Sequence, residues 1–508
     1  MKHGTRYPIL GLCLALVSAA LGQTPKVLTL EESLRIALGQ SFDAARIEQN
    51  LTNAQMSLRA AEAGLKSNSE LRLSNFPDFQ DNEAQTTVSS GRQIFPRQRV
   101  LRFQADLFIN QPVRLTDGVF SLVGSFQRKQ DFGEFQDVAF DENGVPQPIT
   151  VTDPLEFAPQ LRLQFRQPLF TLNQLNTNFV KSALNLEKTE HSYTRSQLDL
   201  VYNVTTNFYN LFKAQQQLEI DTKQVEQSRE AFRIANLKQQ AGLLPEVEVL
   251  RLEVDLANAR NRASASEAAL KETEDFFKVL IGLPIEDSIE VTTHLTYAPI
   301  EVTLEKALAE ALSRRPELRE DEIELELSSI NVKEVDAQRE IKGELNMRYG
   351  IFNRDDNLSG AFQRFNQDRS VVLDLTVPLW DWSKNKYEVE AAKANVENTR
   401  LSQRNRIEII KQEIRKAVRD LKSAQQRVDI TRRSEELAEK SYNISLLKFQ
   451  NGDLSSQDLA LEQNRLTEAR TNSLNAIIDY KNALSDLRRK TLWDFEKNKA
   501  VGVKVSEN

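Results

Sequence analysis

Two carboxylates occupy equivalent places in the sequence and are the best candidates for binding chemistry. Glu248 and Asp458 each lie six residues after a glycine, Gly242 and Gly452 respectively. Glycine suits the position that follows a helix C-terminus, and an acid suits the first turn of the next helix. The spacing therefore predicts two helical hairpins, each with an acidic tip. If several chains brought these tips together, a ring of carboxylates would attract and select cations.

Both acids also have a purely structural interpretation. Pro245 fits the first position of the helix that would carry Glu248, and Ser455 with Asp458 fits a capping box. An acid near a helix N-terminus stabilises the helix by about 0.3–1 kcal/mol. The sequence leaves the cation site and the helix cap open as alternatives.

Residue types that support catalysis are scarce. After residue 22 only His191 and His294 remain of the three histidines, and the one cysteine, Cys13, lies before that point. The sequence contains no glycine-rich phosphate loop and no cluster with metal-ligand spacing. We therefore expect no catalytic residue, no metal site, no cofactor and no enzyme activity. The net charge of −7 also argues against nucleic-acid binding.

Residues 1–22 have the features of a secretory signal peptide. Lys2 and Arg6 are basic, an apolar run extends from Ile9 to Val17, and Ala20-Leu21-Gly22 offers a cleavage site with small residues. No later run of about 18 apolar residues occurs, so we expect no membrane-spanning helix. A membrane could still be crossed by a closed β-barrel, whose strands give a weaker signal in sequence.

The sequence repeats itself. Thr29-Leu30-Glu31 returns as Thr303-Leu304-Glu305 at an offset of 274 residues, and Pro168-Leu169-Phe170 returns as Pro378-Leu379-Trp380 at an offset of 210. The second offset then holds without a gap for about 90 residues. The change of offset predicts a large insertion in the strand region of the first copy. We therefore expect a first repeat at 23–299, a second at 300–495, and a C-terminal tail at 496–508.

Each repeat contains one very long candidate helix. Residues 169–241 and 379–451 contain neither glycine nor proline, and each run has 73 residues, or about 110 Å as a helix. Mostly apolar residues recur at alternating steps of three and four, which is typical of coiled-coil packing: Leu198, Val201, Thr205, Phe208 and Phe212 in the first run, and Ile407, Ile410, Ile414, Val418, Leu421, Gln425 and Val428 in the second. Shorter helices are expected at 246–281 and from 303 to about 342, with a break at Pro316. Such lengths predict the wall of a tube.

Short stretches of alternating polarity precede each long helix. We expect four strands per chain, at about 120–127, 161–169, 345–351 and 371–379, each about as long as a tilted membrane strand. Four strands cannot enclose water, so several chains must share a barrel; three chains would supply twelve strands. Residues 101–110 resemble a further strand with no assigned place, and 131–158 are expected to form a surface loop outside the cell. Past the strand ends stand three aromatic residues of the kind expected at a membrane interface, Phe170, Trp380 and Trp382.

These features together resemble the TolC-like family of outer-membrane efflux proteins. The pattern Thr-Leu-x-x-(Ser/Ala)-Leu-x-x-Ala-Leu at 29–38 and 303–312 is similar to the start of each half of that family. Arg315-Pro316-Glu317-Leu318 matches the usual continuation, as do the two Pro-Leu-(Phe/Trp) segments and the glycine tips. Ser41-Phe42-Asp43 departs from the family, which has a proline step there, and Leu461 replaces a second family acid.

The resemblance implies an α+β membrane protein that forms a homotrimer, in which a twelve-stranded β-barrel continues into a long α-helical coiled-coil barrel. It also implies a place in the outer membrane, in contact with lipid and extending into the periplasm, as the exit duct of a tripartite efflux pump or type I secretion system. The expected partners are a periplasmic adaptor protein and an inner-membrane pump of the RND, ABC or MFS class, and no nucleic acid. Asp458 matches the family position that lines the closed periplasmic entrance, and Glu248 is its counterpart in the first repeat. The alternative is a periplasmic coiled-coil tether without a pore, which would not explain the strands.

Overall fold

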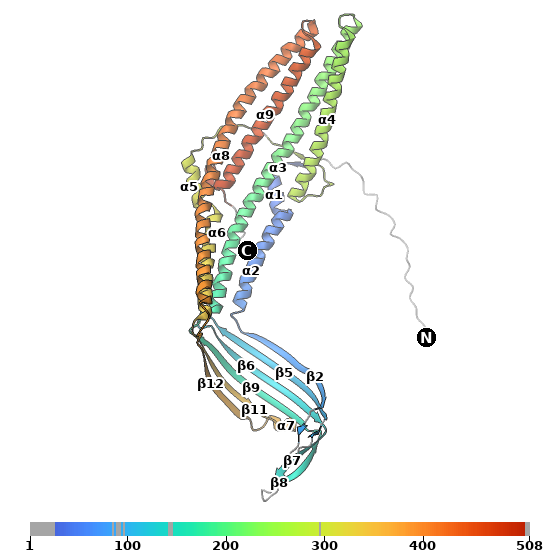
Figure 1. Ribbon diagram of the computed structural model, residues 1–508. Helices are drawn as coiled ribbons and strands as arrows, with labels where there is room; N and C mark the ends of the chain where they lie inside the picture. Colours follow the sequence, from blue (N-terminus) through green and yellow to red (C-terminus); the bar gives the residue numbers. More distant parts are fainter. Residues whose placement is uncertain are drawn as a thin grey trace, which may run out of the picture. The chain divides into compact units, whose positions relative to one another are not determined.

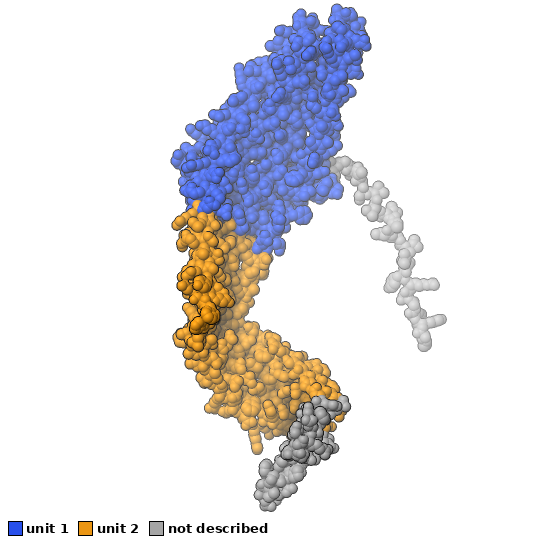
Figure 2. Space-filling model, viewed as in Figure 1, with its two compact units in different colours: residues 1–50, 192–318, 405–508 blue, residues 51–191, 319–404 orange. Residues whose placement is uncertain are grey.

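The computed structural model describes residues 26–502 except 84–85, 88–92, 95–96, 141–145 and 294–295. The expected signal peptide and the end of the tail lie outside the described residues. The chain divides into two compact units (Figure 2). Unit 1 comprises residues 1–50, 192–318 and 405–508, and unit 2 comprises 51–191 and 319–404.

Unit 1 is built from helices (Figure 1). Four helices lie wholly within it: α1 (Leu30–Gln40), α4 (Glu246–Ile281), α5 (Leu304–Arg314) and α9 (Ser456–Thr491). Four others cross the boundary between the units: α2 (Phe42–Ala63), α3 (Gln174–Gln240), α6 (Pro316–Asp336) and α8 (Lys384–Asn451). Two short strand pairs complete the unit: β1 (Lys26–Leu28) with β10 (Ile289–Val291), and β13 (Trp493–Asp494) with β14 (Lys499–Ala500).

Local signals in the sequence explain where the helices of unit 1 begin and end. Thr29 and Glu32 form a capping box at the start of α1, since each side chain bonds the backbone N–H of the other residue. Ser41 then interrupts the helix with an extended backbone, and its hydroxyl accepts a bond from the Ala44 N–H at 3.1 Å, which starts α2. At the end of α4, Gly282 has φ +83°, and an added Cβ would lie 2.6 Å from the carbonyl oxygen of Gln40. Only glycine fits this position.

The two long helices are confirmed, but they begin later than expected. α3 has 67 residues and α8 has 68, because each helix starts five residues beyond the expected Leu169 or Leu379 and α3 also ends one residue earlier, at Gln240. Phe170 and Trp382 have φ values of 59° and 54°, which are incompatible with a continuous right-handed helix. The predicted seam is also confirmed in unit 1, where its central members have exposed fractions of 0–2%: Phe208, Ile410, Ile414, Leu421 and Val428.

Unit 2 contains a six-stranded antiparallel sheet with the order β12-β11-β9-β6-β5-β2. Its strands are β2 (Asn68–Glu83), β5 (Arg97–Val113), β6 (Gly118–Phe132), β9 (Leu155–Leu169), β11 (Lys342–Phe352) and β12 (Asn366–Thr376). The expected count of four strands is therefore wrong. The unassigned strand at 101–110 lies within β5, and together with β2 it forms a hairpin at one edge of the sheet.

The expectation of a loop at 131–158 is also wrong, because β6 and β9 extend into this region. Between them, β7 (Glu134–Phe140) and β8 (Pro146–Thr152) form a separate two-stranded hairpin. The remaining short elements of unit 2 are β3 (Thr86–Thr87), β4 (Gln93–Ile94), the 3₁₀ turn η1 (Ala337–Arg339) and α7 (Leu358–Ala361).

The sheet has one apolar and one polar face. The register places apolar residues in shared cross-strand rows, such as Leu373 opposite Leu345 and Leu163 opposite Leu122. Most of their neighbours along each strand are polar and lie on the other face, and they include Arg102, Asp106, Ser125, Arg162, Arg166, Asn346, Arg348 and Asp374. A few apolar residues, Phe108, Val123 and Val372, share that face. Such a predominance of one polarity on each face is typical of strands that face two different solvents.

Candidate functional site

The tips of the two helical hairpins in unit 1 have the same backbone design. Gly242 and Gly452 adopt φ values of +74° and +94°, in the left-handed region that the sequence predicted. In each tip the glycine N–H bonds the carbonyl three residues back, and the next N–H bonds the carbonyl five residues back. This pair of bonds is the Schellman motif, which satisfies the last carbonyls of α3 and α8.

The two predicted tip acids differ in their surroundings. Asp458 is exposed, and its backbone N–H donates to the Ser455 hydroxyl at 3.1 Å while its carboxylate accepts from that hydroxyl at 2.7 Å. Glu248 has a side chain that is only 19% exposed, and it pairs with Arg251 at 2.8 Å and accepts a hydrogen bond from Ser456. Ser455 thus caps the start of α9, and the Asp458 carboxylate bonds the Ser455 hydroxyl rather than the Ser455 backbone N–H of the expected capping box, while Glu248 connects its own hairpin to the other one.

The two hairpins are packed against each other near their tips. Lys238 of α3 donates to the backbone carbonyl of Phe449 in α8, and its ammonium group lies 5.0 Å from the centre of the Phe449 ring. An apolar cluster lies beneath this contact: Ala231, Ala235, Val249, Leu252, Tyr442, Phe449, Leu459 and Leu466. Because Glu248 is used in this packing, Asp458 is the tip acid that remains available to a ligand or to another chain.

Polar side chains also join α3 to α9, a contact that sequence reasoning missed. Gln463 is 3% exposed and donates to the Ser228 hydroxyl at 2.8 Å, and Gln224 donates to Asn464 at 2.9 Å. These residues occupy positions that would be apolar in a plain heptad seam. The partners are about 240 residues apart in sequence, so no local pattern could reveal them.

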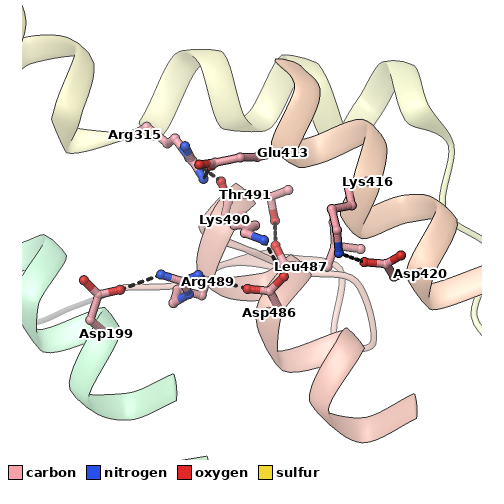
Figure 3. A network of polar contacts seen from close by, with 10 residues as sticks. All are labelled: Asp199, Arg315, Glu413, Lys416, Asp420, Asp486, Leu487, Arg489, Lys490 and Thr491. Carbon is pink, nitrogen blue, oxygen red and sulfur yellow. Dashed lines mark hydrogen bonds and ion pairs between the residues drawn. The ribbon is translucent and has the colours of Figure 1, made fainter. Parts of the chain in front are cut away.

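The Arg-Pro-Glu-Leu motif at 315–318 fixes the break between α5 and α6 onto neighbouring helices (Figure 3). The Arg315 side chain is 8% exposed and donates to the Lys490 carbonyl and to the Glu413 carboxylate, both at 2.8 Å. Arg489 of α9 donates in turn to Asp199 of α3 at 2.6 Å and to Asp486 at 3.0 Å. These contacts connect the α5–α6 break to α8 and α9, and connect α9 to α3.

The electrostatics of Arg489 reflect that network. Burial alone would lower the pKa of its guanidinium, but the hydrogen bonds with Asp486 and Asp199 outweigh burial and raise the pKa above its ordinary value. The guanidinium also lies 4.7 Å from the centre of the Tyr202 ring. The arrangement is that of a fixed structural cation, and it resembles no catalytic centre.

The three predicted interface aromatics lie in unit 2, just beyond the sheet. Phe170 follows the end of β9, and Trp380 and Trp382 follow the end of β12. All three are exposed, by 73%, 72% and 84% respectively, and the two tryptophan rings are 5.0 Å apart. Large aromatic groups exposed in this way mark a surface that meets another phase or another molecule.

Two further observations limit the chemistry of the described residues. Among them, no group of three or more His, Cys, Asp or Glu side chains is arranged to hold a metal ion. No helix in the same part of the chain is both long and apolar enough to span a membrane.

The chain thus combines long helical hairpins with an antiparallel sheet that has one mostly apolar face. The sequence matches the family described as outer membrane efflux protein over residues 159–282 and 307–491, more than half of the chain. The chain therefore belongs to the outer membrane efflux protein family, whose members are transport components. No protein of curated function matches the sequence.

Solved structures of bacterial outer membrane proteins share this fold. The CmeC outer membrane channel of Campylobacter jejuni aligns with a TM-score of 0.68 at 15% identity, covering 94% of this chain and 88% of CmeC. The outer membrane protein VceC of Vibrio cholerae gives 0.65 at 14% identity, with 91% and 95% covered. The MtrE outer membrane channel of Neisseria gonorrhoeae, in its open state, gives 0.65 at 12% identity, with 93% and 91% covered.

Proposed function

We propose that three copies of this chain form an outer-membrane channel through which a tripartite efflux pump or type I secretion system exports its substrates. In this proposal the helices of unit 1 form a tube in the periplasm, and residues 1–22 direct export of the chain. The observation that carries the proposal is the family match combined with the sheet of unit 2, whose apolar face suits lipid and whose polar face suits water. Phe170, Trp380 and Trp382 would then lie at the level of the lipid headgroups.

The partners in this proposal are a periplasmic adaptor and an inner-membrane pump of the RND, ABC or MFS class. The channel itself performs no chemistry, so the pump supplies the energy. We also propose that residues 23–299 and 300–495 are two repeats of one ancestral unit. The equal lengths of α4 and α9, 36 residues each, support that relationship.

Gene deletion followed by complementation tests the efflux role. The deletion strain should become sensitive to a set of compounds, and the wild-type chain should restore resistance to all of them. Native mass spectrometry in detergent should give a trimer. A protein that salt alone releases from membranes, with export unchanged in the deletion strain, would contradict the proposal and would fit a coiled-coil tether instead.

We further propose that Asp458 forms part of a ring of carboxylates at the periplasmic entrance, with Glu248 in a lesser role. Three like charges held together repel each other, which makes a closed entrance only marginally stable and offers a site for cations. The exposure of Asp458 and its place in the first turn beyond the tip support this role.

The matched variants Asp458→Asn and Glu436→Gln test the ring in planar bilayers. Asparagine keeps the side-chain oxygen next to Ser455 and removes only the charge, while Glu436 is an exposed acid on α8 that is paired with Arg433 and Lys440. Asp458→Asn should reduce cation selectivity and weaken block by trivalent cations, and Glu436→Gln should leave both unchanged. Wild-type block in the Asp458→Asn channel would show that this acid is a helix cap alone.

A further inference from the structure

The sheet of unit 2 has two free edges, β2 and β12, and two more strands than the four expected from sequence. We propose that β2 of one copy pairs with β12 of the next copy, so that three copies close a barrel of eighteen strands. This inference rests on the proposed function, which makes the chain a trimeric channel in a membrane. It adds that the transmembrane passage is unusually wide.

The additional hairpin, β2 and β5, has the same alternation of polarity as the other strands. Leu71 of β2 lies opposite Leu107 of β5, and Leu107 lies opposite Gly124 in the apolar face. Leu71 and Leu107 are 64% and 43% exposed, as expected for side chains that would face lipid. On the opposite face Arg72 lies across from Asp106, which accepts a hydrogen bond from Ser125 at 2.5 Å. A soluble flap would not need this division into two faces.

The hairpin is also an integral part of the sheet. β5 pairs with β6 without a break from Arg99 opposite Phe132 to Val113 opposite Gly118. The β2–β5 pairing has one irregularity, between Ser74 and Asp78. Continuous pairing over the length of β5 leaves no boundary at which the hairpin could separate from the other four strands.

The turn between β5 and β6 is anchored to the start of α3. The Asp117 carboxylate accepts a hydrogen bond from the Leu175 N–H at 2.9 Å, and Asn173 donates to the Arg114 carbonyl at 2.6 Å. The Arg114 guanidinium lies 4.1 Å from the centre of the Phe179 ring. These contacts fix the added strands to the same helix that continues from β9.

The strand directions allow the free edges of two copies to meet. Every neighbouring pair in the sheet is antiparallel, and the number of strands is even, so β2 and β12 run in opposite directions. A head-to-tail contact between copies therefore continues the antiparallel pattern and closes into a ring. Within the described residues neither outer edge has a strand partner. In lipid an unpaired edge would leave its N–H and C=O groups without hydrogen bonds, so closure by a second copy is strongly favoured.

A barrel's diameter grows about linearly with its number of strands, so eighteen strands make it about one and a half times as wide as twelve. Barrels of about 16–18 strands enclose an open aqueous channel. The polar face that would line the lumen carries charged side chains on the added strands as well, Arg102 and Asp106 among them. The barrel would then pass bulky hydrated cargo, and selection by size would take place at the helical entrance.

Disulfide cross-linking between copies tests the pairing. The one cysteine of the chain, Cys13, precedes the expected cleavage site, so a Cys13→Ser background is free of competing thiols. Leu71→Cys is combined in turn with cysteine at Val371, Leu373 and Leu375 on the same face of β12, and at Val372 and Asp374 on the other face as matched controls. Only a same-face cysteine directly opposite position 71 brings the two Cβ atoms close enough for a disulfide, and opposite-face cysteines point away from it.

Oxidation should produce covalent dimers and trimers on non-reducing gels for at least one same-face pair, and none for the two controls. Leu122→Cys on β6, an interior strand of the six, should produce none with any β12 cysteine. Cross-links from Leu122→Cys in place of Leu71→Cys would overturn the inference, because they would mean that β6 is the outer strand and the barrel has twelve strands.

Electron cryomicroscopy of the wild-type trimer gives an answer that does not depend on folding of the variants. Eighteen strands support the inference, and twelve overturn it. If twelve strands are found in a trimer that still confers resistance, the inference fails while the proposed function stands. A chain that remains monomeric in the membrane would refute both.

Discussion

Replacement of Arg315 by methionine should destabilise the junction of α5, α6, α8 and α9 in unit 1. Methionine keeps the unbranched apolar stem and removes the guanidinium. The change deletes two hydrogen bonds of 2.8 Å, one to the Lys490 carbonyl and one to the Glu413 carboxylate. The Lys490 carbonyl belongs to the last turn of α9, where carbonyls have no partner within the helix.

The size of the effect follows from burial. A hydrogen bond to a charged group contributes about 1.5–3 kcal/mol when it is shielded from water, and the Arg315 side chain is only 8% exposed. Glu413 is 40% exposed and regains water, which offsets part of the loss. We therefore expect a loss of about 3 kcal/mol in the local free energy of opening, which corresponds to roughly a hundredfold change in the opening equilibrium.

Amide hydrogen exchange followed by mass spectrometry measures this change directly. Peptides from the last turn of α9 should exchange about a hundredfold faster in Arg315→Met than in the wild type. The control is Arg433→Met, which removes a 63% exposed guanidinium that pairs with Glu436 on the same helix and should cost about 0.5 kcal/mol or less. Unchanged exchange in Arg315→Met, or an equal effect in the control, would refute the argument from burial.

Three further variants test other parts of the structure. The hydrogen bond from Arg319 holds the pKa of Glu187 below its ordinary value of 4.5, so this pair stabilises the fold above that pH, and its contribution is lost as pH falls through the folded-state pKa. Glu187→Gln should therefore lower the melting temperature at pH 7, and the difference from the wild type should shrink as pH falls below 4.5. A difference that does not change with pH would exclude the pairing. Gly452→Ala should lower the local stability of the α8 tip by about 1–2 kcal/mol. The cost comes from the backbone, whose φ is +94°, since an added Cβ would meet no atom within 4 Å. Amide exchange at the end of α8 measures this loss, and wild-type protection there would contradict the left-handed backbone. Asp117→Ala should cost about 1 kcal/mol, because it removes the acceptor of the Leu175 N–H in the first turn of α3. Amide exchange should become faster in that turn and stay unchanged at the end of α4.

Sequence reasoning succeeded where a property repeats along the chain. The absence of glycine and proline from 174–240 and 384–451 identifies the long helices, and the glycine tips define their ends. It failed for β2, because the alternation of Leu71 and Leu73 is interrupted by a register shift before Phe79. When polar and apolar residues alternate over only a few positions, the pattern alone does not distinguish a strand from a loop.

At the hairpin tips, sequence reasoning failed for contacts between residues that are far apart in the chain. The spacing from each glycine predicted both tip acids and the cap formed by Ser455. The difference between the acids depends on Ser456, which lies 208 residues from Glu248 in sequence and beside it in the fold. No property of Glu248 or of its sequence neighbours indicates that contact, since it is created by the packing of one hairpin on another.

The open edges of the six-stranded sheet have a consequence for biogenesis. A lone copy that entered the bilayer would place two rows of unsatisfied backbone groups in hydrocarbon, at a cost of several kcal/mol for each group. If copies close the barrel as proposed, insertion would be coupled to association and would depend on the local concentration of newly delivered chains. Cells that make little of this protein would accumulate unassembled chains outside the bilayer, where the same edges are exposed to aggregation and proteolysis.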